Sequence, residues 1–502
     1  MSYMRTLTVM VGKGDPLFSY AGTITALANN LSNAARFRQR QLMTAAKKPV
    51  EEWSDNESEV VAELITVYPD IIREGLEHNS NLLCSYYRLE ELMRGTDNPD
   101  FFANGLSRQC SQHILRQAAK DMKSFFSAVK AYNRKPEHFT GRPELPGYKK
   151  KGGHTTVFIT NQDCVISEKD GRWYAAFPLI KEHRLCIGHP VSDARLKEVT
   201  VTPDHGRYRF CFKFEVYTDL PMMPETSARI CAVDFGVNNL MAITNNCGLP
   251  CILYKGGIIK SVNQLYNKTA AGIVSSQTKS TGKKFAPDEK YTQTTHKRND
   301  TIDDHMHKYA KHLVTWCVEN RIDTIVLGSN AFWKQEVSIG NVNNQNFVQI
   351  PFDKLKNIIS YLCERSGIRC IEQEESYTSK SSFLDMDPIP VYKKGDDTVY
   401  HFSGRRYPTR YKGMHKADGF RGLYRSADGT IISSDLNGSA NILRKAFPDA
   451  FIKHAMPDFS NIKIIRHPDK DCDAANRQKQ KKLPKTDSHA KAKRHRRKAN
   501  AA

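Results

Sequence analysis

Three short apolar runs follow one another between residues 229 and 254, and they restrict the fold more than any other feature of the chain. The segments RICAVDF, NLMAITNN and GLPCILY contain these runs, each of strand length. Between the runs, Gly236–Asn239 and Asn245–Gly248 are rich in turn-forming residues. We therefore expect three successive strands joined by tight turns.

Helices and strands alternate after these runs. After a polar linker, an apolar stripe at helical spacing predicts an amphipathic helix. The stripe consists of Ile302, Met306, Tyr309, Leu313 and Trp316. The strand IDTIVLG (322–328), a helix around Leu355 and the strand GIRCIEQEE (367–375) come next. Three strands followed by alternating helix and strand are the order of an RNase H-like α/β layer architecture.

The N-terminal half has two other patterns. Residues 3–11 predict a strand, and helical periodicity then continues to about residue 135, where Pro136 ends it. From about 138 to 220 the apolar residues recur with period two, and residues 203–206 are turn-forming. These patterns predict a helical domain inserted after a first strand, and a β-barrel or sandwich.

The chain is strongly basic, with 75 Lys and Arg against 54 Asp and Glu and a formal net charge of +21. Such an excess predicts a polyanionic partner, foremost nucleic acid, and the plain alternative is a merely basic surface. Residues 477–498 hold eleven Lys or Arg and one acid, which is typical of a disordered tail.

Other compositional features exclude some classes of protein. The apolar runs are far shorter than the roughly 20 residues of a membrane helix, so we expect no membrane partner. The twelve cysteines include no CxxC pair, which argues against a zinc ribbon or a disulfide framework. Free thiols in a reducing cytoplasm are the expectation.

Two aspartates are candidates for metal ligands. Asp234 ends an apolar strand just before Gly236, where an unpaired carboxylate is costly, so it either caps the turn or binds a divalent cation. Asp435 leads the helical segment DLNGSANILRK, where it either caps the helix or places its carboxylate beside Asp234. Its small neighbours would let that helix pack closely.

The third acid is less sharply defined by the sequence. The strand 322–328 ends in Gly328, whereas the next strand ends in Glu374 and Glu375. We prefer Glu375, which lies nearest the strand exit, with Glu374 as its rival and a solvated strand edge as the plain alternative. Three carboxylates around two Mg²⁺ ions, or Mn²⁺ in their place, would hydrolyse a phosphodiester and leave a 5′ phosphate.

Five blocks in this chain resemble the transposon-encoded TnpB family and its relatives, the compact type V CRISPR nucleases. They are AVDFGVNN, NNQNFVQIPF, ESYTSKSSFLD, RGLYRSADGT and DLNGSANILRK. The resemblance covers residues 230–446 well and the N-terminal half only in its order of patterns. It implies an RNA-guided DNA endonuclease of the cytoplasm of a prokaryote, associated with the nucleoid, whose partners are a guide RNA and double-stranded target DNA with a short adjacent motif.

The resemblance also implies a domain plan for a multidomain α+β protein. A wedge-like β-barrel would comprise residues 1–20 and 137–225, and a helical recognition lobe residues 21–136. A RuvC-like nuclease domain would comprise 226–376 and 431–455. A small insert that binds target nucleic acid would occupy 377–430, and a basic, disordered tail 456–502. The active particle would be a monomer or a homodimer.

This chain departs from the family pattern at two places. Many family members hold a zinc ion with paired CxxC motifs, but residues 377–430 contain no cysteine, so we expect no zinc site there. Gly328 occupies the usual glutamate position, so activity would depend on Glu375 or Glu374. The rival hypotheses are an inactive RNA-guided DNA-binding repressor and a guide-independent RuvC-type nuclease or transposase accessory protein. Phe332, Trp333 and Phe347 are candidates for stacking on bases, with core packing as their commoner role.

Overall fold

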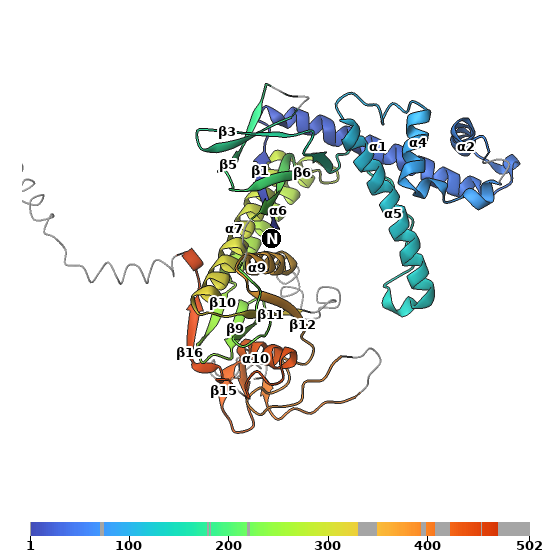
Figure 1. Ribbon diagram of the computed structural model, residues 1–502. Helices are drawn as coiled ribbons and strands as arrows, with labels where there is room; N and C mark the ends of the chain where they lie inside the picture. The colour runs from blue at the N-terminus through green and yellow to red at the C-terminus, as the bar shows by residue number, and fades with distance from the viewer. Residues whose placement is uncertain are drawn as a thin grey trace, which may run out of the picture. The chain divides into compact units, whose positions relative to one another are not determined.

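The chain divides into two compact units, Met1–Asp219 and Leu220–Ala502. The computed structural model describes residues 2–70, 75–177, 180, 182–217, 221–329, 349–392, 398–406, 422–452 and 454–469. Each unit combines helices with β-sheets, so the protein has a mixed α/β, multidomain fold (Figure 1).

The N-terminal unit contains two antiparallel sheets, with strand orders β1-β7-β6-β2 and β3-β4-β5. Their bounds are β1 Ser2–Val11, β2 Val157–Thr160, β3 Val165–Lys169, β4 Arg172–Ala176, β5 Arg184–Gly188, β6 Ala194–Asp204 and β7 Arg207–Tyr217. The predicted period-two strand is confirmed, because alternate residues of β7 from Tyr208 to Val216 are buried. The hairpin between β6 and β7 is tighter than the expected turn. Only His205 and Gly206 lie outside the strands, both at positive φ (48° and 82°), as two-residue hairpin turns require.

Helices make up the rest of the N-terminal unit. They are α1 Leu17–Ala45, α2 Asp55–Val67, α4 Tyr86–Gly95 and α5 Arg108–Arg134, with 3-10 turns η1 Val50–Glu52, η2 Leu76–Asn79, η3 Leu82–Cys84 and η4 Pro136–His138. Along α1, Leu17, Ala21, Ile24, Ala28 and Leu31 are buried at the three- and four-residue spacing of one helix face. The predicted helical segment up to Pro136 is confirmed. The division of this unit into a barrel and a recognition lobe stays a prediction.

The C-terminal unit is built on a six-stranded sheet of order β12-β11-β8-β9-β10-β16. The bounds are β8 Ile230–Phe235, β9 Asn239–Asn245, β10 Pro250–Lys255, β11 Thr324–Ser329, β12 Arg369–Glu374 and β16 Asp458–Ile465. The three predicted successive strands are confirmed as β8, β9 and β10, which pair antiparallel. Strands β11 and β12 are parallel to β8, so the carboxyl ends of these three strands meet at one edge of the sheet.

Helices cover both faces of this sheet. They are α6 Gly257–Thr281, α7 Glu289–Glu319, α9 Phe352–Arg365 and α10 Ser434–Ala446. On one face, Ile442 and Leu443 of α10 pack on Ile230, Ala232 and Val326. On the other, α7 and α9 share a larger apolar core with β8 and β9. Asp234 is two residues after Ala232 along β8, so the two side chains lie on the same face of the sheet, the face that α10 covers.

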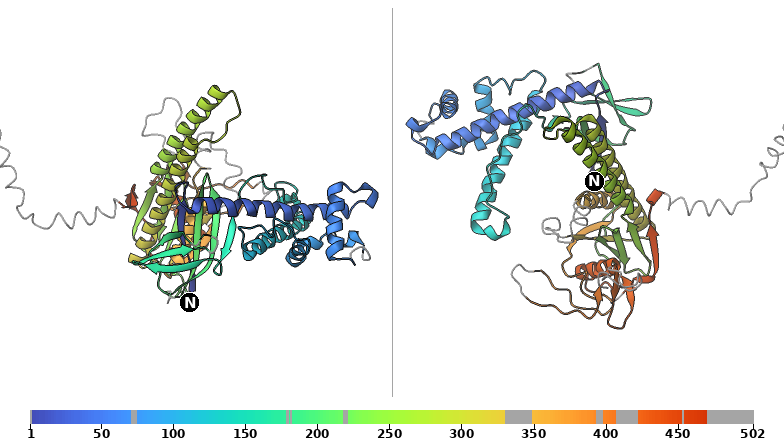
Figure 2. Two further views of the ribbon diagram at one scale, coloured as in Figure 1. Left: turned by 90° about the horizontal axis from the view of Figure 1, so that it is seen from above. Right: turned by 180° about the vertical axis from the view of Figure 1, so that it is seen from behind.

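Two segments differ from the sequence prediction. Residues 257–281, which lie in the expected polar linker, form α6, which runs beside α7 (Figure 2). Only Ile259, Asn263 and Ile273 of α6 are buried, so its apolar periodicity is too sparse to recognise. The expected tail 456–502 is also wrong in part, because β16 pairs parallel with β10 at the sheet edge. Only Ile465 of β16 is buried, so its sequence gives little signal of a strand.

The insert at 377–430 is turn-rich, as predicted, and its described residues form a small sheet with the strand that precedes α10. This sheet has the order β13-β14-β15, with β13 Arg405–Arg406, β14 Leu423–Arg425 and β15 Ile431–Ser433. Among the helices that the structure describes, each is too short or too polar to span a lipid bilayer.

Candidate nuclease site

Asp234 lies near the carboxyl end of β8, beneath α10. The turn that follows β8 is closed by its backbone, since Gly236 N–H donates to the Leu240 carbonyl at 3.3 Å. A cap from Asp234 is therefore not needed to form this turn. The carboxylate instead points at Gly438 of α10, where a Cβ atom would lie 2.5 Å from Asp234 Oδ2.

Helix α10 approaches the sheet closely because its contact residues are small, as the sequence predicts. The buried Ser439 hydroxyl donates to the Ala232 carbonyl at 2.8 Å and accepts from Thr244 N–H at 3.1 Å. These bonds join α10 to β8 and β9 right beside Gly438. The register of α10 over Asp234 is therefore held by polar contacts as well as by apolar packing.

Asp435 lies in the first turn of α10, beyond the N-cap position. The expectation that Asp435 caps the helix is wrong, because Ser433 occupies the N-cap. One Asp435 oxygen, Oδ2, accepts a hydrogen bond of 2.7 Å from the Asn239 side-chain amide at the start of β9. The Asp435 carboxylate also raises the pKa of Asp234 electrostatically, so the two aspartates share one site.

Glu375 reaches the same site from the end of β12. Its N–H donates to the Ser329 carbonyl at 3.2 Å, which extends the pairing of β12 with β11. A Cβ atom at Gly328 would lie 2.6 Å from Glu375 Oε2 and 3.2 Å from the Val233 carbonyl. The missing side chain at Gly328 is therefore the space into which the glutamate of the neighbouring strand extends.

Glu374, the rival acid, is committed elsewhere. Its carboxylate accepts from Lys445 Nζ at 2.7 Å and from Ser376 N–H at 2.6 Å. Burial alone would raise the pKa of Glu374, but Lys445 and Ser376 hold it below its usual value. Glu375 Oε2, by contrast, is buried and has no hydrogen-bond partner among the described residues.

The electrostatics of the site favour a bound cation. Burial, then the charges of Glu375 and Asp435, raise the pKa of Asp234 well above its usual value, while Arg406 opposes this rise. Burial also raises the pKa of Glu375 to about 7, although Lys356 acts against it. Clustered carboxylates with raised pKa values become favourable as anions when a divalent ion lies among them.

The donor set fits a hard cation such as Mg²⁺, since all three candidate ligands supply carboxylate oxygens. Among the described residues, Glu375 Oε2 has no hydrogen-bond partner that would compete with the cation. The three side chains do not yet converge fully. Across the described part of the chain, no three His, Cys, Asp or Glu side chains stand close enough together to enclose an ion.

Four residues of this site were not singled out from the sequence. Asn239 and Gly438 lie within the blocks AVDFGVNN and DLNGSANILRK, but their contacts are with residues some 200 positions away. Arg406 and the buried Lys356 reach the site from β13 and α9, and no local pattern marks either of them. The predicted stacking residues Phe332, Trp333 and Phe347 lie outside the described residues.

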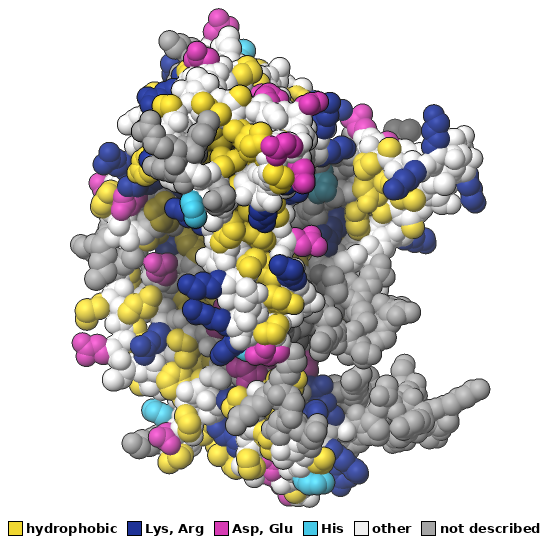
Figure 3. All heavy atoms as spheres, turned by 90° about the vertical axis from the view of Figure 1, so that its right-hand side faces the viewer, with side chains coloured by type: hydrophobic (Ala, Val, Ile, Leu, Met, Phe, Trp, Pro, Cys, Tyr) yellow, Lys and Arg dark blue, Asp and Glu magenta, His cyan; other side chains and the backbone are white. Residues whose placement is uncertain are grey.

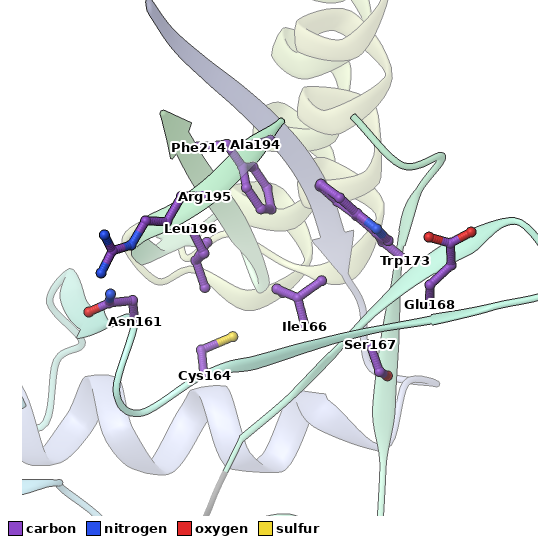
Figure 4. Close-up of a pocket in the computed structure, with 10 residues that line it drawn as sticks. All are labelled: Asn161, Cys164, Ile166, Ser167, Glu168, Trp173, Ala194, Arg195, Leu196 and Phe214. Carbon is purple, nitrogen blue, oxygen red and sulfur yellow. The ribbon is translucent and has the colours of Figure 1, made fainter. Parts of the chain in front are cut away.

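The N-terminal unit has a pocket of about 440 Å³ lined by β3, β4, β6 and β7 (Figure 4). The Trp173 and Phe214 rings, 4.9 Å apart, line it together with Ile166. Glu168 is the only acid among its lining residues, so this pocket is not a second carboxylate site.

In Figure 3, Lys and Arg side chains are scattered among apolar and acidic ones over the face drawn.

Comparisons with known proteins give one family match and several weak structural likenesses. Among curated proteins, none matches. A Cas12f1–sgRNA–target DNA complex is 13% identical with a TM-score of 0.32, covering 88% of this chain and 98% of that chain. Alicyclobacillus acidoterrestris C2c1 with single-guide RNA is 8% identical with a TM-score of 0.31, covering 83% of this chain and 70% of that chain. Likenesses this weak carry no argument about this protein. The predicted resemblance to the TnpB family is confirmed by sequence, since residues 212–333 match the OrfB_IS605 family, described as a probable transposase.

Proposed function

We propose that this chain is an RNA-guided DNA endonuclease with a two-Mg²⁺, RuvC-type site formed by Asp234, Glu375 and Asp435. The observation that carries the proposal is that these three acids, from separate parts of the chain, approach one edge of a single sheet, where Glu375 and Asp435 both raise the pKa of Asp234. The family match over residues 212–333 includes β8 and therefore Asp234. Three antiparallel strands that continue into two parallel ones across helices further support an RNase H-like sheet.

Each acid would have a distinct part in holding the ions. Asp234, which lies on β8 directly beneath α10, would be the central ligand. Glu375 would contribute Oε2, the oxygen without a hydrogen-bond partner among the described residues. Asp435 would bind from the first turn of α10. When bound, two Mg²⁺ ions, or Mn²⁺ in their place, would supply water activation and stabilisation of the leaving 3′ oxygen, so the product would carry a 5′ phosphate.

The domain plan belongs to the same proposal. The wedge-like barrel (1–20 and 137–225) and the helical lobe (21–136) would hold the guide RNA and its heteroduplex with target DNA. The insert 377–430 would contact target nucleic acid without zinc. The nuclease domain would extend through β16 to residue 465, so the basic tail would begin after it. The particle would act in the cytoplasm of a prokaryote, as a monomer or a homodimer.

Cleavage by the purified ribonucleoprotein tests this proposal. With Mg²⁺ and a matched double-stranded target, the wild type should cut, and Asp234→Ala should abolish cutting while target binding persists. Sequencing the copurified RNA would identify the guide. Cleavage that survives Asp234→Ala would refute the site, and RNA-free protein that still cuts would point to a guide-independent nuclease.

One observation favours a second function, an RNA-guided DNA-binding protein that does not cut. The three carboxylates are not yet close enough to enclose an ion in the described residues. Under this alternative, the ribonucleoprotein binds a matched target but leaves it intact at every Mg²⁺ or Mn²⁺ concentration. A single cleavage assay with a binding control separates the two functions.

A further inference from the structure

Asn239 links the candidate ligand Asp435 to a lysine on the other side. Its Nδ2 donates to Asp435 Oδ2 at 2.7 Å, and its Oδ1 accepts from Lys255 Nζ at 2.7 Å. Asn239 begins β9 and Lys255 ends β10, and the two residues pair across these strands. The contact to α10 thus starts from two paired strands, at a point where their register shifts between Tyr254 and Lys255.

The chemistry of the two neighbours determines how the Asn239 amide is oriented. A lysine ammonium can only donate and an ionised carboxylate can only accept, so the amide must turn its oxygen to Lys255 and its nitrogen to Asp435. Reversing the amide would place two donors together and two acceptors together. Lys255 therefore selects the orientation in which Asn239 serves Asp435 as a donor.

The bond from Asn239 also distinguishes the two oxygens of Asp435. Oδ2 is held by a short hydrogen bond, whereas Oδ1, within the described part of the chain, has a single long contact of 3.4 Å from the Ser434 hydroxyl. A carboxylate with one oxygen held in this way presents its other oxygen in a fixed direction. Groups that orient metal ligands typically change metal affinity by about 10–100-fold when removed.

We propose that Asn239, oriented by Lys255, is a positioning residue that sets the Asp435 carboxylate for metal binding. This inference rests on the proposed function, since it concerns the same site. It assigns Asn239 and Lys255 no contact with DNA or with the reacting atoms. Their effect is exerted through Asp435 alone.

The chain offers a matched control beside this pair. Asn238 Oδ1 accepts from Lys260 Nζ at 2.9 Å in an exposed asparagine–lysine pair that does not involve Asp435. The test compares Asn239→Leu and Lys255→Met with Asn238→Leu and Lys260→Met in the ribonucleoprotein. Mn²⁺ binding is measured by electron paramagnetic resonance, and cleavage is measured against Mg²⁺ concentration.

We expect Asn239→Leu to weaken Mn²⁺ binding and to raise the Mg²⁺ concentration for half-maximal cleavage by about 10–100-fold. Lys255→Met should give a smaller shift, and the double variant should be no worse than Asn239→Leu, because Lys255 acts through Asn239. The Asn238 and Lys260 variants should behave as wild type. Additive effects of Asn239→Leu and Lys255→Met, or equal effects at Asn238 and Asn239, would overturn the inference alone. A wild type that binds no Mn²⁺ would overturn the proposed function as well.

Discussion

Gly438→Ala adds one methyl group at the point where α10 meets the candidate nuclease site. The new Cβ would lie 2.5 Å from Asp234 Oδ2 and 3.4 Å from its carboxyl carbon. Moving the Asp234 carboxylate costs free energy, because it is buried and its neighbours at the site are also acids. Either Asp234 rotates away from the sheet edge or α10 shifts outward.

Two opposing effects determine the stability of this variant. Alanine in place of a helical glycine stabilises a helix by about 1 kcal/mol. Overpacking a buried contact costs about 1–3 kcal/mol. The net change in the free energy of unfolding should therefore lie between neutral and a loss of about 2 kcal/mol. Cleavage should fall far more, since a displacement of about 1 Å in a reacting group can reduce the rate about 100-fold.

Gly272→Ala is the matched control, because Gly272 lies in α6 and a Cβ atom there would have no other atom within 4 Å. It should stabilise the protein by about 1 kcal/mol and leave cleavage unchanged. Urea denaturation and Mg²⁺-dependent DNA cleavage measure the two quantities for both variants. Wild-type cleavage by Gly438→Ala, at an unchanged Mg²⁺ requirement, would refute the argument that α10 confines Asp234.

Three further outcomes follow from the site. Glu375→Gln should abolish cleavage whereas Glu374→Gln should largely spare it; the reverse ranking in a cleavage assay would show that the rival acid is the ligand. In metal-free protein, the pKa of Glu375 of about 7 against the ordinary 4.5 means that the folded state favours the protonated acid. The contribution of Glu375 to stability should therefore be fully present below about pH 4.5 and be lost, by about 3 kcal/mol, as the pH rises from about 4.5 through about 7, a component of the pH dependence that urea denaturation should find missing in Glu375→Gln. Ser439→Ala removes the buried hydroxyl that donates to the Ala232 carbonyl and accepts from Thr244 N–H, so the melting temperature should fall, by the equivalent of about 1–3 kcal/mol; an unchanged value would contradict the role of this hydroxyl.

Local patterns were enough to predict five of the six strands of the C-terminal sheet, β8 to β12, and to single out both aspartates. The run ICAVDF predicts a buried strand with an acid near its end, and DLNGSANILRK predicts a helix with a face of small residues that can pack closely. The preference for Glu375 over Glu374 also followed from the position of the two residues along one strand. The space above Gly328 that accommodates the Glu375 side chain could not be predicted, because it depends on how β11 and β12 align.

Other features could not be predicted, because they depend on contacts between distant parts of the chain. The strand β16 becomes recognisable only through its pairing with β10, some 200 residues earlier. Helix α6 is too polar to show an apolar stripe. Asn239 resembles any turn asparagine until α10 brings Asp435 to it.

The separation of the site's parts along the chain has a consequence for synthesis on the ribosome. Asn239 and Asp435 are 196 residues apart, so at about 5–20 residues per second the ribosome needs about 10–40 s between them. During that interval, nascent β8 lacks the helix that covers Ile230 and Ala232. A growing chain thus exposes an apolar sheet face that a chaperone could bind, and on the proposed function it cannot cut nucleic acid until α10 emerges.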